Sequence, residues 1–164
     1  MKNIILIGMP GAGKSTIGVI LAKSMLFDFC DTDLSIQKVT GESLCETISK
    51  IGIEDFIKLE DKVISSQYFE SSVVATGGSA VYGEEAMKKL RTEGIAVYLK
   101  LSAEELERRI DNIHTRGIAM KEGTTISALY DERSPLYEKY ADIDLNCSGL
   151  TAEQCVDRII DMMK

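Results

Sequence analysis

A short apolar run followed at once by a glycine-rich turn constrains this 164-residue chain more than any other feature. Residues 4–7 read Ile-Ile-Leu-Ile, which is typical of a parallel strand buried on both faces. Residues 8–16 read G-M-P-G-A-G-K-S-T and contain the spacing G-x-x-x-x-G-K-[ST], just where an amphipathic helix over 15–25 is expected to begin. A strand, a glycine-rich turn and a helix in this order predict a phosphate-binding loop.

The residue types of this loop suit a nucleoside triphosphate with Mg²⁺. Glycines lack the Cβ atoms that would keep backbone N–H groups away from phosphate oxygens. Lys14 supplies a mobile positive charge for the β- and γ-phosphates, and the Ser15 hydroxyl is a ligand for Mg²⁺. A functionless glycine-rich turn is the alternative, and the agreement of strand, spacing, lysine and helix argues against it. The expected nucleotide contacts are Gly11, Ala12, Gly13, Lys14, Ser15 and Thr16.

Composition limits the partners and the location of the protein. A net charge of -7 disfavours sequence-independent binding to nucleic acid, which requires a surplus of basic residues on one face. No apolar run is long enough to span a bilayer, and the first apolar residues are interpreted as a strand rather than a signal peptide. We therefore expect a cytoplasmic monomer without membrane partners. The cysteines lack C-x-x-C spacing, so we expect no zinc site and four reduced core residues, Cys30, Cys45, Cys147 and Cys155.

Strand-like and helix-like segments alternate along the whole chain. This alternation predicts an α/β three-layer sandwich, with a five-stranded parallel sheet and helices on both faces, as a single domain over residues 1–164. Strands are expected at 4–7, 26–30, 72–75, 95–101 and 143–147. Helices are expected at 15–25, 34–39, 43–69 with a break at Gly52, 83–91, 102–112, 125–140 with an interruption at Arg133-Ser134-Pro135, and 151–163.

Three further segments are expected at the edge of the sheet that carries the phosphate-binding loop, because ligands of parallel sheets bind beyond the carboxyl ends of the strands. Asp31 and Asp33 follow the second strand, and we expect one of them to cap a helix while the other faces the nucleotide. The turn at 76–79, T-G-G-S, follows the third strand and is either a tight connection or part of the site. Residues 112–124 lack periodicity, which suits an active-site lid.

With these residues in place, the chain resembles the shikimate kinases, small enzymes similar to the nucleoside-monophosphate kinases, over nearly its whole length. The phosphate-binding loop is shared with many unrelated ATPases and GTPases, whereas D-T-D directly after the second strand is much more specific. The resemblance rests on the loop at 8–16, D-T-D at 31–33, F-x-x-x-E at 56–60, T-G-G at 76–78, Arg109, Arg116, and R-S-P-L-Y at 133–137.

The resemblance implies an activity and a division of the chain. The activity is the ATP-dependent phosphorylation of the 3-hydroxyl of shikimate, a step of aromatic amino-acid biosynthesis, with Mg²⁺ as the metal. The acceptor would bind to helices within about 34–69, and the lid would span about 112–124. Gly77 and Gly78 would contact the acceptor, and Lys14, Asp33 and Arg116 would be the catalytic residues.

The resemblance also assigns individual roles. Asp31, with Ser15, would hold the Mg²⁺ and its water shell, and Asp33 would contact the acceptor hydroxyl. Arg116 would be the lid arginine that closes on the transferring phosphate. Arg109 would lie against the adenine, and Arg133 would grip the acceptor carboxylate, for which an arginine fork is the natural partner. A surface charge on an acidic helix is the structural alternative for Arg133.

Three residues depart from the family pattern, and all three concern the acceptor. Ile57 stands where the family usually has an arginine that makes the second grip on the acceptor carboxylate, and Lys58 points about 100° further round the helix. Ser79 replaces the third glycine of a triple, and Gly117 replaces the proline of the lid.

These departures leave two other functions open. One is a kinase for another small polyol or hydroxy acid. The other is a nucleotide-binding protein with reduced or no activity. The joint retention of Lys14, Ser15, Asp33 and Arg116 argues against the second, because a pure nucleotide binder needs neither the acceptor aspartate nor the lid charge.

Overall fold

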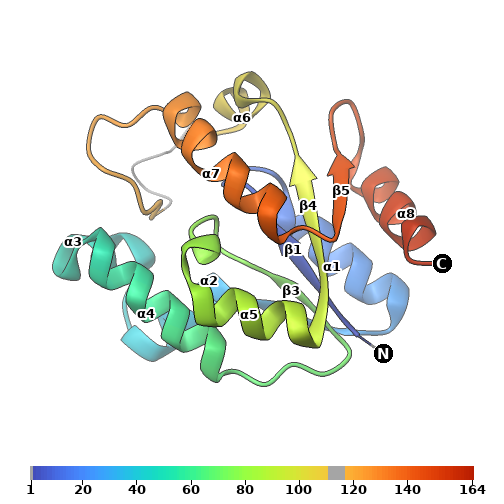
Figure 1. Cartoon of the computed structure of the whole chain (residues 1–164), viewed down its shortest axis with the longest axis horizontal. Coiled ribbons are helices and arrows are strands. Elements are labelled where there is room, and N and C mark those ends of the chain that lie inside the picture. Colours follow the sequence, from blue (N-terminus) through green and yellow to red (C-terminus); the bar gives the residue numbers. More distant parts are fainter. Residues whose placement is uncertain (1, 111–116) are drawn as a thin grey trace.

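Five parallel strands form one sheet in the protein, which a computed structural model describes over residues 2–110 and 117–164. The strands lie in the order β2-β3-β1-β4-β5 (Figure 1), and all four strand pairs are parallel. The sheet expected from the sequence is confirmed. Its strands are β1 (Asn3–Ile7), β2 (Asp28–Asp31), β3 (Ser72–Ala75), β4 (Gly94–Lys100) and β5 (Ile143–Asn146).

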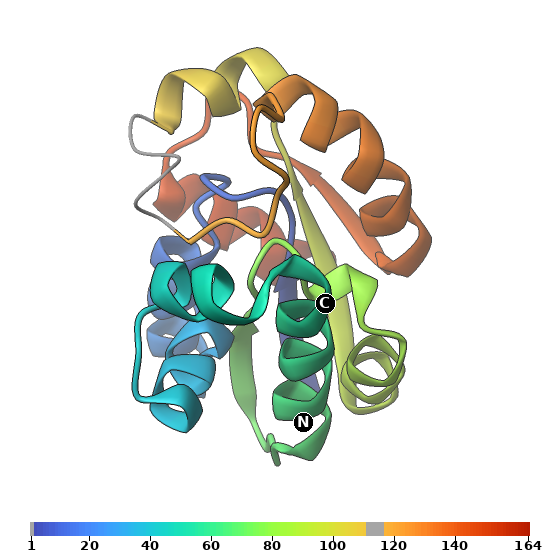
Figure 2. The ribbon, with the colours of Figure 1, turned by 90° about the vertical axis from the view of Figure 1, so that its left-hand side faces the viewer.

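Helices cover both faces of this sheet, which confirms the three-layer arrangement (Figure 1 and Figure 2). On one face α1 (Lys14–Met25) packs against α8 (Ala152–Met162), and α5 (Glu84–Glu93) and α7 (Ile126–Tyr140) lie on the other. A group of three helices beside the sheet consists of α2 (Thr32–Thr40), α3 (Leu44–Ile51) and α4 (Ile53–Ser66), which contact one another. The remaining helices are η1, a 3₁₀ turn (Ala80–Tyr82), and α6 (Ala103–Arg109).

Two groups of buried apolar side chains hold these layers together. The larger group contains all the apolar residues of β1, which is buried along its whole length, as expected for a central parallel strand. The smaller group joins the three helices α2, α3 and α4 to the segment before α7. It consists of Ile36, Leu44, Phe56, Val63 and Ala119.

Local sequence signals set several helix boundaries. Gly52 has a φ of +83° and separates α3 from α4, so the expected break is confirmed. Ser102 caps α6 and Thr151 caps α8, each in a reciprocal pair with the residue three positions later. In the described ranges, no helix is both long enough and apolar enough to cross a bilayer.

The second strand lies later in the chain than the sequence predicts. Residues 26–30 were expected as the strand because Leu26 and Phe27 are apolar, but β2 is Asp28–Asp31. Leu26 instead ends α1 in the left-handed conformation, with a φ of +58°, and it is 92% exposed. The prediction was wrong because an apolar residue serves here as a helix C-cap, and the correction places Asp31 at the end of the strand.

The expected interruption at Arg133-Ser134-Pro135 is also wrong, because α7 continues through Pro135. A proline inside a helix removes one backbone hydrogen bond. The helix persists because Leu129, Arg133 and Tyr137, which lie one turn apart, are all buried and anchor it on both sides of the proline. The cysteines need a correction too: none of the four forms a disulfide, but only Cys147 and Cys155 are buried, whereas Cys30 and Cys45 are half-buried.

Candidate active site

The phosphate-binding loop curls between β1 and α1 as the sequence predicts. Gly11 and Gly13 have φ values of +84° and +93°, a conformation that residues with a Cβ rarely adopt. Lys14 begins α1 and donates hydrogen bonds from Nζ to the carbonyl oxygens of Gly8, at 2.6 Å, and Met9, at 2.8 Å. The lysine is thereby held along the inside of the loop, where it borders the cavity described below.

Ser15 and Asp31 meet at the start of α1 and the end of β2. The Ser15 hydroxyl donates to Asp31 Oδ2 over 2.7 Å. The other carboxylate oxygen of Asp31 accepts from the backbone N–H of Asp33 at 3.0 Å and so caps α2. Asp31 is therefore the capping residue of the pair, and it also presents an oxygen beside the phosphate-binding loop.

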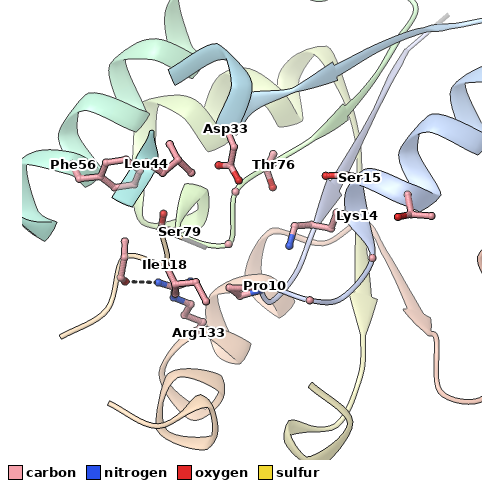
Figure 3. A pocket seen from close by; sticks show the side chains of 17 residues that line it. Pro10, Lys14, Ser15, Asp33, Leu44, Phe56, Thr76, Ser79, Ile118 and Arg133 are labelled. Carbon is pink, nitrogen blue, oxygen red and sulfur yellow. Dashed lines mark hydrogen bonds between the residues drawn. The ribbon is translucent and has the colours of Figure 1, made fainter. Parts of the chain in front are cut away.

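Asp33 is left for another task, because its own carboxylate is not the helix cap. It lines the cavity that Lys14 and Arg133 also line (Figure 3). Burial and, to a smaller extent, the negative charge of Asp31 raise the pKa of Asp33 to about 6, although Lys14 opposes both effects. A carboxylate with this pKa is ionised near neutral pH and remains able to accept a proton.

The turn after β3 is glycine-rich because the charged side chains of the site approach its backbone closely. A Cβ on Gly77 would lie 2.5 Å from Asp33 Oδ1, and a Cβ on Gly78 would lie 2.9 Å from Arg133 Nη1. Thr32 Oγ1 accepts from the Gly77 N–H at 3.1 Å, and Tyr137 donates to the Gly78 carbonyl oxygen at 2.6 Å. The turn is therefore part of the site and more than a tight connection.

Arg133 is buried, with 1% of its surface exposed, so it is not the surface charge that the sequence left as an alternative. Its Nη2 donates to the carbonyl oxygen of Ala119 at 2.7 Å, and its Nε donates to the Tyr82 hydroxyl at 3.3 Å. The guanidinium also lies over the Tyr82 ring, 5.3 Å from its centroid. These contacts place a cation at the side of the cavity opposite Asp33 (Figure 3).

The segment 117–124 runs past α3 toward α7 and forms part of the cavity wall (Figure 2). Gly117 has a φ of +65°, and a Cβ there would lie 2.5 Å from Leu44 Cβ and 2.8 Å from the Cys45 backbone nitrogen. Proline fixes φ near −65°, so the proline usual in the family does not fit this path. The first part of the expected lid, residues 112–116, lies outside the described residues. It includes Arg116, whose role stays a prediction.

Most of the expected site residues line one cavity of about 350 Å³, but Asp31 is not among its lining residues. The phosphate-binding loop, α2, the turn after β3, the segment 117–119 and α7 each contribute to its wall. Of the expected site residues, the cavity brings together Gly11, Gly13, Lys14, Ser15, Thr16, Asp33, Gly77, Gly78 and Arg133.

A second cavity, of about 190 Å³, lies on the other side of the phosphate-binding loop. Arg109 lines it together with the loop residues Ala12 and Gly13, and its Nη1 donates to the Gly11 carbonyl oxygen at 3.5 Å. Residues just after β5 and at the start of α8 complete the wall. Arg109 is thus exposed beside the loop, separate from the acidic and basic groups around the first cavity.

Reasoning from the sequence did not assign a role to Glu60, which adjoins the first cavity. This residue of α4 is 1% exposed, and its Oε1 accepts a hydrogen bond from the Ser79 hydroxyl at 2.6 Å. A glutamate on the buried stripe of a helix, four residues after Phe56, was the available signal. Ser79 has a φ of −91°, so its Cβ is accommodated without strain.

Ile57 is half-buried and is not among the residues that line the first cavity, and Lys58 is exposed. Lys58 forms its ion pair with Asp55, at 3.5 Å on the solvent side. Within the described residues, Arg133 and Lys14 are therefore the cations that line the cavity.

Known proteins with this architecture agree with the geometry. A sequence model described as shikimate kinase matches residues 10–164. The shikimate kinase of Thermodesulfovibrio yellowstonii is 37% identical over 98% of this chain and 94% of its own length. That of Caldanaerobacter subterraneus is 36% identical over 98% of this chain and 95% of its own.

Solved structures extend the likeness to three dimensions. The shikimate kinase of Acinetobacter baumannii, solved in complex with shikimate, superposes with a TM-score of 0.90 at 28% identity and covers 99% of this chain and 93% of its own. A deoxyadenosine kinase at 14% identity, with a TM-score of 0.66, shares the fold alone. The match of the family model over nearly the whole length, together with relatives above 30% identity, settles the ancestry: the chain belongs to the shikimate kinase family.

Proposed function

We propose that the protein transfers the γ-phosphoryl group of ATP to the 3-hydroxyl of shikimate. The observation that carries this proposal is the single cavity that joins a phosphate-binding loop to a buried arginine and a carboxylate with a raised pKa. The loop is built for phosphate, the arginine for a carboxylate, and the aspartate for an acceptor hydroxyl. The solved Acinetobacter relative binds shikimate, which is an acid with hydroxyl groups.

Mg²⁺ fits the donor set at the start of α1. The Ser15 hydroxyl and the Asp31 carboxylate are hard oxygen donors 2.7 Å apart, and Mg²⁺ typically takes few protein ligands and completes its shell with phosphates and water. In this proposal Ser15 and Asp31 hold the ion. When bound, Mg²⁺ neutralises charge on the β- and γ-phosphates.

The residues of the chain contribute positioning and charge, which is most of what phosphoryl transfer requires. In this proposal Asp33 orients the acceptor hydroxyl and takes its proton at Oδ1 or Oδ2. Lys14 leaves its carbonyl contacts in the loop for the β- and γ-phosphate oxygens, Arg109 lies against the adenine, and Arg133 holds the acceptor carboxylate. Arg116, outside the described residues, is proposed to stabilise the transferring phosphate on closure.

A second acceptor stays in consideration because of Ile57. Position 57 does not bring a second cation to the cavity, and the loss of one arginine–carboxylate contact costs about 1.5 to 3 kcal/mol, or one to two decades of affinity. Such a loss is compatible with shikimate as a weakly bound acceptor. It is equally compatible with a smaller acid or a neutral polyol.

An ADP-release assay with shikimate, quinate and gluconate separates these acceptors. The proposal expects Mg²⁺-dependent ADP release that is fastest with shikimate. Faster release with another acid or polyol would keep the kinase and replace its acceptor. Stabilisation of the fold by Mg-ADP is the control for nucleotide binding, because a ligand that binds only the folded state raises the melting temperature.

A further inference from the structure

The carboxyl group of Glu60 lies directly behind the wall of the first cavity. Ser79, which lines the cavity, donates to Glu60 Oε1 at 2.6 Å. The other oxygen, Oε2, is buried and accepts no hydrogen bond from the described part of the chain. A Cβ on Gly77 would lie 2.8 Å from this oxygen and 2.5 Å from Asp33 Oδ1, so two acids converge on one residue of the wall.

A carboxyl group with these surroundings is poorly suited to a negative charge. An ionised carboxylate in a protein interior needs a cation or several hydrogen-bond donors, and a hydroxyl supplies one donor. The helical position three residues before Glu60, from which a cation would reach it along α4, is occupied by Ile57. Burial raises the pKa of Glu60 to about 7, even though the hydrogen bond from Ser79 favours the charged form.

The protonation state of Glu60 is expected to affect the binding of an anionic ligand, because of the charged groups around it. The charged groups that face it are Asp33 from α2, Lys14 from α1 and Arg133 from α7. In the described residues, no charged group of α3, α5 or η1, which also pack against α4, acts on it. Lys14 belongs to the phosphate side, so Arg133 alone would face both an ionised Glu60 and the carboxylate of an acceptor.

We propose that Glu60 is a proton-linked positioning residue for the acceptor: the cavity binds an anionic acceptor with Glu60 neutral, and ionisation of Glu60 weakens that binding through Ser79 and Gly77. A proton thus takes the place of a second cation at this wall. The proposal rests on the proposed function for the identity of the acid, and the proton comes from solvent and returns to it when the acceptor leaves.

The linkage has a definite sign. Below pH 7 Glu60 is already neutral and acceptor affinity is at its acid limit. As the pH rises through 7, free Glu60 ionises, and binding of the acid then requires the uptake of a proton. Affinity falls tenfold for each unit by which the bound acceptor raises the pKa of Glu60, and we expect about one decade between pH 6 and pH 8.5.

Calorimetric titration of shikimate into the whole protein, from pH 6 to pH 8.5 in two buffers with different ionisation enthalpies, tests this. The wild type is expected to take up a proton on binding near pH 8. Glu60→Gln is expected to keep at pH 8.5 the affinity that the wild type has at pH 6. Its proton uptake on binding should be smaller, and the difference from the wild type is the contribution of Glu60. Asp33 is present in both proteins, so its contribution cancels. Ser79→Ala is expected to move the midpoint to higher pH, because the lost hydrogen bond favours the charged form.

Several outcomes would overturn the proposal. If the affinity for shikimate changes equally with pH, and proton uptake is equal, in the wild type and Glu60→Gln, then Glu60 is not the group whose proton is linked to binding. If Glu60→Gln does not fold, binding of the methyl ester of shikimate to the wild type provides the test. This neutral ligand should keep its affinity above pH 7. An equal loss of affinity for the ester and the acid would contradict the inference. Failure of shikimate to bind at any pH while Mg-ADP still binds is different, because it would refute the proposed function.

Discussion

Arg133 donates a hydrogen bond from Nη2 to the carbonyl oxygen of Ala119 across 2.7 Å, so a buried cation of α7 holds the segment that walls the cavity near α3. The Nη1 of the same guanidinium lies close to Gly78, where a Cβ would be 2.9 Å away, and its Nε donates to the Tyr82 hydroxyl. The arginine is thus fixed by neighbours on three sides before any acceptor arrives, which lowers the entropic cost of using it to bind a carboxylate.

Arg133→Lys is expected to raise the KM for shikimate by about one to two decades, because lysine keeps the charge but loses the planar fork that makes several contacts at once. The affinity for ADP, which is proposed to bind at the loop on the side of Arg109, should stay within about twofold of the wild type. Steady-state kinetics and nucleotide titration measure the two quantities. Arg108→Lys, at a solvent-exposed position of α6, is the matched control. A loss of ADP affinity equal to the loss of shikimate affinity would show that Arg133 supports the fold as a whole.

Lys14→Met is expected to abolish phosphoryl transfer and leave the fold intact, because the ammonium group balances charge that grows on the phosphate oxygens during transfer. Lys14 already lies along the loop through its contacts with two backbone carbonyls, so its removal changes the loop more than the core. The turnover rate and the melting temperature are the measurements. Lys23→Met, on the exposed face of the same helix, should behave like the wild type, and wild-type turnover in Lys14→Met would refute the assignment of the loop.

Turnover should rise with pH through about 6, because Asp33 accepts a proton from the acceptor hydroxyl only when it is ionised. The raised pKa sets the sign: below 6 the carboxyl is neutral and inactive as a base, and above 6 it is charged. Asp33→Asn should be nearly inactive at every pH, since an amide positions a hydroxyl but does not take its proton. The pH profile of kcat measures this. Full activity of Asp33→Asn would leave Asp33 as a purely structural residue.

The sequence identified the parts of the site that are local in the chain. The phosphate-binding loop, a capping role for one of Asp31 and Asp33, and the two glycines after β3 are each encoded within a few residues, and the parallel sheet then brings them to one edge. The burial of Arg133 was harder to foresee, because it depends on Ala119 and Tyr82 from other elements.

Other features depend on contacts between residues far apart in the chain, which no local sequence pattern predicts. The Ser79–Glu60 hydrogen bond joins residues 19 positions apart, and the positive φ of Gly117 reflects its approach to the backbone of α3. Leu26 misled the strand prediction because hydrophobicity says nothing about a left-handed helix end. Pro135 misled the helix prediction because the buried residues on either side outweigh one lost hydrogen bond.

Ile57→Arg is expected to tighten shikimate by about one to two decades if shikimate is the natural acceptor, because a charge-assisted fork would add a second contact to the carboxylate. An arginine there would also reach Glu60, three residues along α4, and should remove the loss of affinity above pH 7. The KM for shikimate at pH 6 and pH 8.5 measures both effects, with Lys58→Arg as the exposed control. No improvement with shikimate would indicate that the natural acceptor is another compound.

The most direct test of the central claim is identification of the product by phosphorus NMR after incubation of the protein with Mg-ATP and shikimate. We predict a new phosphate-ester resonance coupled to the proton on carbon 3 of shikimate, in amounts equal to the ADP released, and none with Lys14→Met. ADP release without this ester, or an ester only on an added polyol, would contradict the assignment of the protein as a kinase that phosphorylates the 3-hydroxyl of shikimate.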